Sequence, residues 1–144
     1  MPTSLLPIAL SQVGNNGSRY QSWAGIGGAD WCAAFVSWCA QQAGFTLDPS
    51  ALSQEIYDNP PSSFPPDVFP RFYTVGRGAA WFRAAGRLQI SKGHGGNYTP
   101  QPGDIIFFAW DSSTYVPELW HVGIVKSVTG GRIYTVEGNN SGGV

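Results

Sequence analysis

Two cysteines and two histidines are the residues of this 144-residue chain whose types and spacing point most directly to chemistry. Both cysteines, Cys32 and Cys39, lie in the stretch "GGADWCAAFVSWCAQQAGF". Its apolar spacing predicts one helix, with Asp30 as the N-cap and Gly44 just beyond the end. Seven residues of helix rise about 10 Å, whereas the Cα atoms of a disulfide lie within about 7 Å. We therefore expect two free thiols, too far apart to share a metal ion.

The two thiols are expected to differ in reactivity. Cys32 falls in the first helical turn, where unpaired backbone N–H groups and the positive end of the helix dipole favour a thiolate. Cys39 lies two turns deeper, where a cysteine is usually a small buried hydrophobe. A nucleophilic thiol also needs a base to take its proton, so a role for Cys32 depends on a histidine.

His121 is the better candidate for that base. His94 lies in the glycine-rich "SKGHGGN", where we expect a surface loop, whereas His121 opens a predicted strand, "HVGIVKSV". If the following "TGG" forms a three-residue loop, His121 lies opposite Asn139, with Glu137 diagonally adjacent on the same face. A two-residue loop would shift the register by one and move Glu137 to the opposite face. The site therefore depends on the loop, and the sequence favours the three-residue form.

Together these residues predict thiol acyl-transfer chemistry. Cys32 would be the nucleophile and His121 its base, with Glu137 or Asn139 fixing the far ring nitrogen. The backbone N–H of Cys32 would donate to the oxyanion of a tetrahedral intermediate. Such a site cleaves an amide bond.

The elements that must position these residues divide the chain into a helical part and a strand part. "SLLPIALSQVG" predicts a short amphipathic helix, "RYQSWAGIGGA" a loop, and the cysteine stretch the next helix. Residues 47–77 hold clustered prolines and predict an irregular excursion, a candidate lid, followed by a helix with Trp81 and Phe82 inward. "DIIFFAW", "HVGIVKSV" and "RIYTVEGN" predict three antiparallel strands. Helices first and a meander afterwards predict an α+β fold, with the cysteine helix against the sheet.

The blocks "DWCAAFVSWCAQQAG", "PGDIIFF", "HVGIV" and "YTVEGN", in this order, resemble the CHAP family of cysteine- and histidine-dependent amidohydrolases and peptidases. The resemblance implies a papain-like fold and a bacterial or phage peptidoglycan hydrolase of the endolysin type. Such an enzyme is an N-acetylmuramoyl-L-alanine amidase or a peptide endopeptidase. By position, the family's nucleophile falls on Cys32, its base on His121, its orienting acid on Glu137 and its polar fourth member on Asn139.

Departures from the family pattern bear on metal, specificity and boundaries. Some members bind calcium through aspartates before the cysteine, but that region here holds only Asp30, so we predict no metal and no other cofactor. Residues 48–71 have no counterpart that aligns, which leaves specificity open. Relatives usually add a strand after the region "NNSGGV", so a C-terminal strand is expected to be missing from residues 1–144, taken as a single catalytic domain.

Aromatic residues make up 14% of the chain and would suit a groove for sugar and peptide. We expect Trp120, beside His121, and Trp31, beside Cys32, to contact substrate. The wider aromatic set considered for that groove also includes Trp23, Trp110 and Tyr115.

Composition excludes several classes of partner. Eight basic and nine acidic residues leave a net charge of -1, without the basic patch that nucleic acid requires. No apolar stretch approaches the roughly 20 residues that span a bilayer. "MPTSLLPIALSQVG" lacks the features of a Sec signal, so we expect release by lysis or another route and action on the bacterial cell wall, as a monomer.

Two other functions remain open at this point. The fold would serve as a non-catalytic wall-binding module, although such a module has no need of every member of the triad. The same triad would also serve a transglutaminase-like cysteine acyltransferase.

Overall fold

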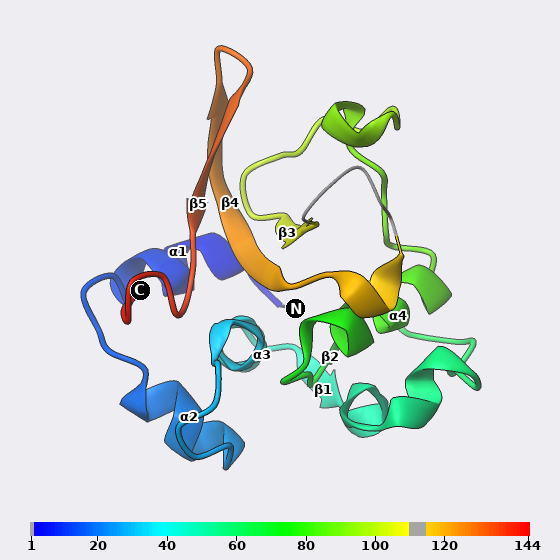
Figure 1. Cartoon of the computed structure of the whole chain (residues 1–144), viewed down its shortest axis with the longest axis horizontal. Helices are drawn as coiled ribbons and strands as arrows, with labels where there is room; N and C mark the ends of the chain where they lie inside the picture. The colour runs from blue at the N-terminus through cyan, green and yellow to red at the C-terminus, as the bar shows by residue number, and fades with distance from the viewer. Residues whose placement is uncertain (1, 110–114) are drawn as a thin grey trace.

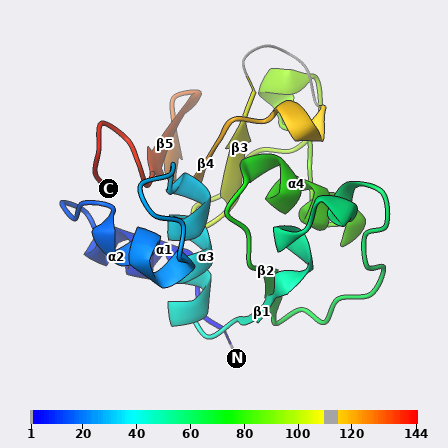
Figure 2. The ribbon, with the colours of Figure 1, turned by 60° about the horizontal axis from the view of Figure 1, so that its bottom comes forward.

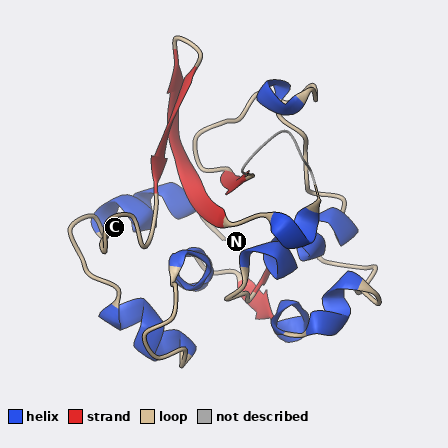
Figure 3. Ribbon diagram, in the orientation of Figure 1, coloured by secondary structure: helices blue, strands red, loops and turns tan. Residues whose placement is uncertain are grey.

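The computed structural model describes residues 2–109 and 115–144. Its helices are α1 (Leu5–Ser11), α2 (Ser18–Ala24), α3 (Cys32–Gln42) and α4 (Val75–Ala84). Its strands are β1 (Thr46–Asp48), β2 (Val68–Pro70), β3 (Ile105–Phe108), β4 (His121–Thr129) and β5 (Arg132–Val136). Short 3-10 helices span Pro49–Leu52, Gln54–Tyr57, Lys92–His94 and Val116–Glu118. Helices dominate the first part and an antiparallel sheet the last, as Figure 3 shows, so the predicted α+β class is confirmed.

Helix α3 forms the centre of the molecule. It contacts α1 and α2 on one side, β1, β2 and α4 on another, and β4 of the sheet (Figure 2). Most of its side chains are buried, including those of Phe35, Val36 and Cys39. The buried Ser37 hydroxyl donates to the Phe72 carbonyl at 2.9 Å and accepts from the Phe72 N–H at 3.0 Å. A helix buried on several faces holds its N-terminal residue in a fixed place.

The C-terminal end of α3 agrees with the prediction, and the N-terminal end differs from it. Gly44 has a φ of +97° just beyond the helix, as expected for the residue that ends it. The N-cap position is taken by Trp31, not Asp30, and no side chain caps the first turn. The prediction for Asp30 was wrong because its carboxylate accepts a hydrogen bond from the side chain of Asn139, which follows β5.

The region between α1 and α3 was predicted as a loop, and this prediction was wrong. Residues 18–24 form α2, which begins where the Asn16 side chain accepts a hydrogen bond from the Ser18 N–H at 3.1 Å. Tyr20 of α2 is fully buried, with its ring stacked on Trp31. Burial of one aromatic side chain outweighs the weak helix preference of this glycine-flanked segment.

The proline-rich excursion is irregular, as predicted, but it is packed into the core. Phe69 and Phe72 are buried, and so are Ala51 and Ile56 of the two 3-10 helices. Strands β1 and β2, which the sequence did not predict, pair in parallel with Leu47 opposite Phe69. Pro70 lies in β2 without breaking it because a strand of a two-stranded sheet is an edge strand.

The last part of the described chain is a three-stranded antiparallel sheet in the order β3-β4-β5. Figure 1 shows the β4–β5 hairpin extending away from the helices at its turn and reaching α3 at its other end. After β5 the chain returns to the segment that follows α1, where the Val144 N–H donates to the Asn15 carbonyl at 3.0 Å. The sheet thereby brings the start of β4 and the end of β5 beside the start of α3.

Candidate active site

Cys32 is the first residue of α3 and lines a pocket of about 320 Å³. The other residues of this pocket are Asp30, Trp120, His121, Glu137, Asn139 and Asn140. Cys32 is 5% exposed, so the pocket is its access to solvent. The first N–H groups of a helix have no acceptor within it, and α3 has no capping side chain. The positive end of the helix dipole therefore acts on the sulfur of Cys32.

The imidazole of His121 packs against two neighbouring aromatic rings at the start of β4. Strand pairing places His121 opposite Phe108, whose ring centroid lies 5.5 Å from that of the imidazole. The Trp120 ring stacks on the imidazole at 5.3 Å with an interplanar angle of 27°. These contacts restrict the ring of His121 before any substrate is present.

Glu137 accepts a hydrogen bond from the Nε2 of His121 at 2.7 Å. Hydrogen bonds to Cys32 and to Glu137 raise the pKa of His121 to about 9, against the opposing effect of burial. Since Nε2 faces Glu137, Nδ1 is the nitrogen left for Cys32. The hydrogen bond to His121 also lowers the pKa of the Glu137 carboxyl. The two partners of His121 therefore favour the protonated form of its imidazole.

The route by which Glu137 reaches His121 differs from the one that the sequence predicted. Thr129 pairs with Arg132, so the turn holds two residues, Gly130 and Gly131. With regular pairing, a two-residue turn would place Glu137 on the wrong face. A β-bulge between Val125 and Ser127 leaves Lys126 as the extra residue and restores the predicted register, in which Val125 pairs with Thr135. The predicted loop was wrong, and the predicted face of Glu137 was right.

Two glycines allow the strands to approach where the site is built. Gly123 continues the register opposite Glu137, and a Cβ atom on it would lie 2.7 Å from Cγ of Glu137. Gly138 lies against α3, where a Cβ atom would be 2.6 Å from Cβ of Phe35 and 3.0 Å from the Trp31 ring. The absence of side chains at these positions lets Glu137 cross to His121 and lets β5 end against the start of α3.

Asn139 belongs to the pocket, but its hydrogen bond is not to His121. Its Nδ2 donates to Oδ1 of Asp30 at 3.0 Å, and its φ of +59° lies in the left-handed region that asparagine tolerates better than most residues. This hydrogen bond joins Asn139, which follows β5, to Asp30, which precedes α3. Glu137, and not Asn139, is the side chain that holds the far nitrogen of His121.

The aromatic residues expected around the substrate have different environments. Trp120 is 44% exposed and lines the pocket, so its ring is accessible from it. Trp31 is 4% exposed and packs in the core against Tyr20 and Phe35, so its ring offers no surface to a substrate. Trp23 packs on Arg71 away from the pocket lining, and Tyr115 is exposed. Trp110 lies outside the described residues.

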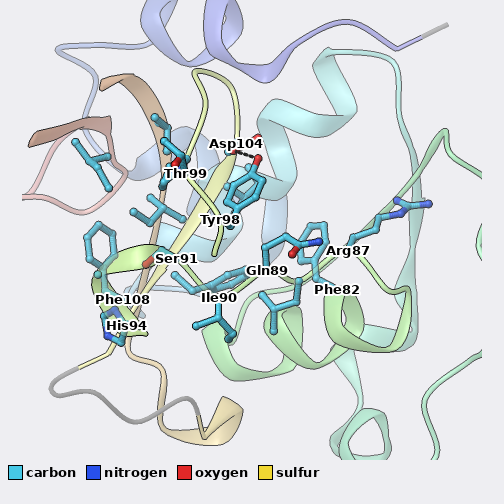
Figure 4. Close-up of a pocket in the computed structure, with 18 of the residues that line it drawn as sticks. Phe82, Arg87, Gln89, Ile90, Ser91, His94, Tyr98, Thr99, Asp104 and Phe108 are labelled. Carbon is cyan, nitrogen blue, oxygen red and sulfur yellow. Dashed lines mark hydrogen bonds between the residues drawn. The ribbon is translucent and has the colours of Figure 1, made fainter. Parts of the chain in front are cut away.

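The remaining cysteine and histidine lie apart from this pocket. Cys39 is fully buried, and burial raises the pKa of its thiol. His94 is exposed on the wall of a second and larger cavity of about 780 Å³ (Figure 4). That cavity is mostly apolar and includes Phe82, Ile90 and Phe108. The lining of this larger cavity contains none of the three residues Cys32, His121 and Glu137, so we assign the cavity no part in their chemistry.

The described parts of the chain contain no group of three or more His, Cys, Asp or Glu side chains placed to hold a metal ion. In residues 2–109 and 115–144, no helix has the length and apolar character needed to cross a membrane.

Comparison with known families agrees with this geometry. The model of the CHAP domain family matches residues 23–139, which include the pocket residues up to Asn139. Searches of curated proteins and of solved structures returned no match. The chain therefore belongs to the CHAP domain family. Its members are of the peptidoglycan hydrolase and amidase type and act on the cell wall.

Proposed function

We propose that this protein hydrolyses an amide bond of bacterial peptidoglycan through Cys32, His121 and Glu137. The observation that carries the proposal is the continuous chain of contacts from the thiol at the start of α3, through the imidazole, to the carboxylate. In this series of contacts the thiol has a base, His121, and the base has an orienting acid, Glu137. These are the relations that nucleophilic catalysis by cysteine requires.

In the first half of the reaction the thiolate of Cys32 attacks the carbonyl carbon of the scissile amide. The carbonyl π electrons move to oxygen, and the resulting oxyanion accepts a hydrogen bond from the backbone N–H of Cys32. The intermediate collapses with cleavage of the C–N bond. His121 donates its proton to the departing nitrogen, so an amine leaves and a thioester remains on Cys32.

In the second half, neutral His121 takes a proton from a water molecule, whose oxygen attacks the thioester carbonyl. Collapse of this intermediate breaks the C–S bond and releases a carboxylic acid, and the thiolate and the imidazolium are restored. Glu137 keeps the imidazole in one orientation and stabilises its charge in both halves.

For substrate binding we propose the half-exposed face of Trp120, which stacks beside His121 at the pocket. An aromatic face of this kind binds the apolar face of a sugar or the flat surface of a peptide group. The scissile bond lies either between muramic acid and the stem peptide or within the peptide. The first makes the protein an N-acetylmuramoyl-L-alanine amidase and the second an endopeptidase, acting on the wall as a bacteriolytic enzyme.

The test compares the wild-type protein with Cys32→Ala on purified cell walls, with turbidity as the readout. We expect clearing by the wild type and none by Cys32→Ala. The matched control is Cys39→Ala, which also removes a thiol from α3 but leaves the pocket intact, and which we expect to clear walls at the wild-type rate. Unchanged clearing by Cys32→Ala would eliminate the thiol mechanism.

Mass spectrometry of the digested walls identifies the bond. New muramic acid carboxyl groups paired with new alanine N-termini indicate an amidase, and new termini inside the peptide indicate an endopeptidase. A cross-linked product without hydrolysis indicates the acyltransferase alternative. Wall binding by a wild-type protein that releases no fragment indicates a binding module.

A further inference from the structure

The carboxylate of Glu137 is held by a second side chain as well as by His121. Its Oε1 faces Nε2 of His121, and its Oε2 accepts a hydrogen bond from the hydroxyl of Thr135. Thr135 lies two residues earlier in β5, so its side chain is on the same face of the strand as Glu137. The two oxygens of one carboxylate thus have two different partners.

The surroundings of Thr135 favour a fixed hydroxyl. Thr135 pairs with Val125, which is fully buried, and its own side chain is half-buried. A β-branched side chain has few accessible χ1 rotamers, so the strand backbone largely determines where the hydroxyl points. Glu137 has three side-chain torsions, and a contact at only one oxygen would leave its carboxylate free to rotate about the last of them.

We propose that Thr135 is a positioning residue, which fixes the plane of the Glu137 carboxylate so that its other oxygen meets Nε2 of His121. This inference rests on the proposed function. Thr135 lies outside the lining of the pocket, and its hydroxyl donates to Glu137, so we expect it to act through Glu137. Its effect must therefore appear in the titration of His121 as well as in the rate.

The experiment uses Thr135→Val, which removes the hydroxyl with little change in shape, and Thr135→Ser, which keeps it. Each variant is also made with His94→Gln, so that the imidazole signal in the NMR spectrum comes from His121 alone. The titratable groups around that ring are Cys32, Glu137 and, at the edge of the pocket, Asp30. All three are retained in every variant.

We expect Thr135→Val to lower the pKa of His121 and to reduce the initial clearing rate about tenfold, the factor for one lost hydrogen bond to a charged group. Thr135→Ser should restore both quantities to near the wild-type values. Circular dichroism and the melting temperature of each variant show whether the fold is kept.

Three outcomes would overturn the proposal. The first is a Thr135→Val variant with the wild-type rate and the wild-type His121 titration. The second is a loss of rate with an unchanged titration, which assigns a purely structural role. The third is a Thr135→Ser variant as impaired as Thr135→Val. If the wild-type protein clears no walls, the proposed function fails, and the titration still tests the position of Thr135 because it needs no substrate.

Discussion

The two ends of the β4–β5 hairpin differ in what their side chains do. At the turn end, the side chains of Ile133 and Tyr134 are 39% and 49% exposed. At the site end, Thr135, Glu137 and His121 share one face and one chain of hydrogen bonds. The bulge at Lys126 lies between the two ends. It accommodates the one extra residue of β4 that a two-residue turn places between the two registers. We interpret the register at the site as determined by contacts at the site end, with the turn adapting to it.

An insertion on the site side should have the largest effect on this arrangement. One alanine inserted between Val136 and Glu137 turns Glu137 to the opposite face of the sheet, because side chains alternate along a strand. We expect wall clearing to fall about 100-fold or more, the contribution of a correctly oriented base. The measurement is the initial rate of turbidity loss, with circular dichroism to show that the sheet is retained.

The matched control for this insertion lies at the other end of the hairpin. One glycine inserted between Gly130 and Gly131 lengthens an exposed turn, and we expect activity within about twofold of the wild type because loop tips tolerate insertions. Equal losses in the two insertion variants would show that the turn does govern the register, contrary to our interpretation.

A smaller but still clear loss is expected for Gly123→Ala. The added Cβ atom would lie 2.7 Å from Cγ of Glu137, and the Glu137 side chain relieves this contact only by moving away from His121. Overpacking of this kind costs about 1–3 kcal/mol, so we expect clearing to fall about tenfold or more. Thermal unfolding measured on the same samples separates loss of the site from loss of the fold.

Tyr134→Thr is the control for Gly123→Ala at the turn end. Because Tyr134 is 49% exposed, we expect its replacement to change the free energy of unfolding by about 0.5 kcal/mol or less and to leave clearing unchanged. A Gly123→Ala variant as active as Tyr134→Thr would show that the Glu137 side chain accommodates the added methyl group and still reaches His121.

The pH dependence should show the smallest of the three effects. The pKa of His121 is raised in the folded protein, so its protonated ring contributes stability that is fully present below pH 6.5 and is lost as the pH rises through about 9. Clearing should follow a bell-shaped profile whose alkaline limb reports this deprotonation. In Glu137→Gln the pKa of His121 falls, and we expect the alkaline limb to move down by about one pH unit.

The profile is measured as initial clearing rate from pH 5 to pH 10 in buffers of constant ionic strength. The Tyr134→Thr variant serves again as the reference, since it leaves every titratable group of the pocket in place. An alkaline limb at the same pH in Glu137→Gln and in the reference would contradict the role of Glu137.

Much of the fold followed from patterns that act over short distances. The apolar spacing around Cys32 and the glycine after it predicted α3, and the strand sequences predicted β3, β4 and β5. Burial of Trp81 and Phe82 on α4 was predicted from their position in a helical pattern. Helix α2 was missed because its stability comes from Tyr20 packing on Trp31, a contact between segments that propensity does not describe.

The sequence indicated which residues form the candidate site, but it indicated less well how the strands bring them together. The types of Cys32, His121 and Glu137 and their order limit the chemistry to a few arrangements, and parity along the hairpin put two of them on one face. The bulge at Lys126 was not predicted, because a two-residue turn with a bulge and a three-residue turn give the same pairing at Val125. The partner of Asp30 was also missed, since Asn139 lies far from it in sequence.

The contact of Gly138 with Phe35 and Trp31 has a consequence for how reactivity arises during synthesis of the chain. Cys32, the proposed nucleophile, is synthesised early and Glu137 late, and they come together only when the end of β5 packs on the start of α3. Until the end of β5 packs on the start of α3, Cys32 has neither His121 nor Glu137 beside it. The proposed site is therefore assembled only by completion of the fold.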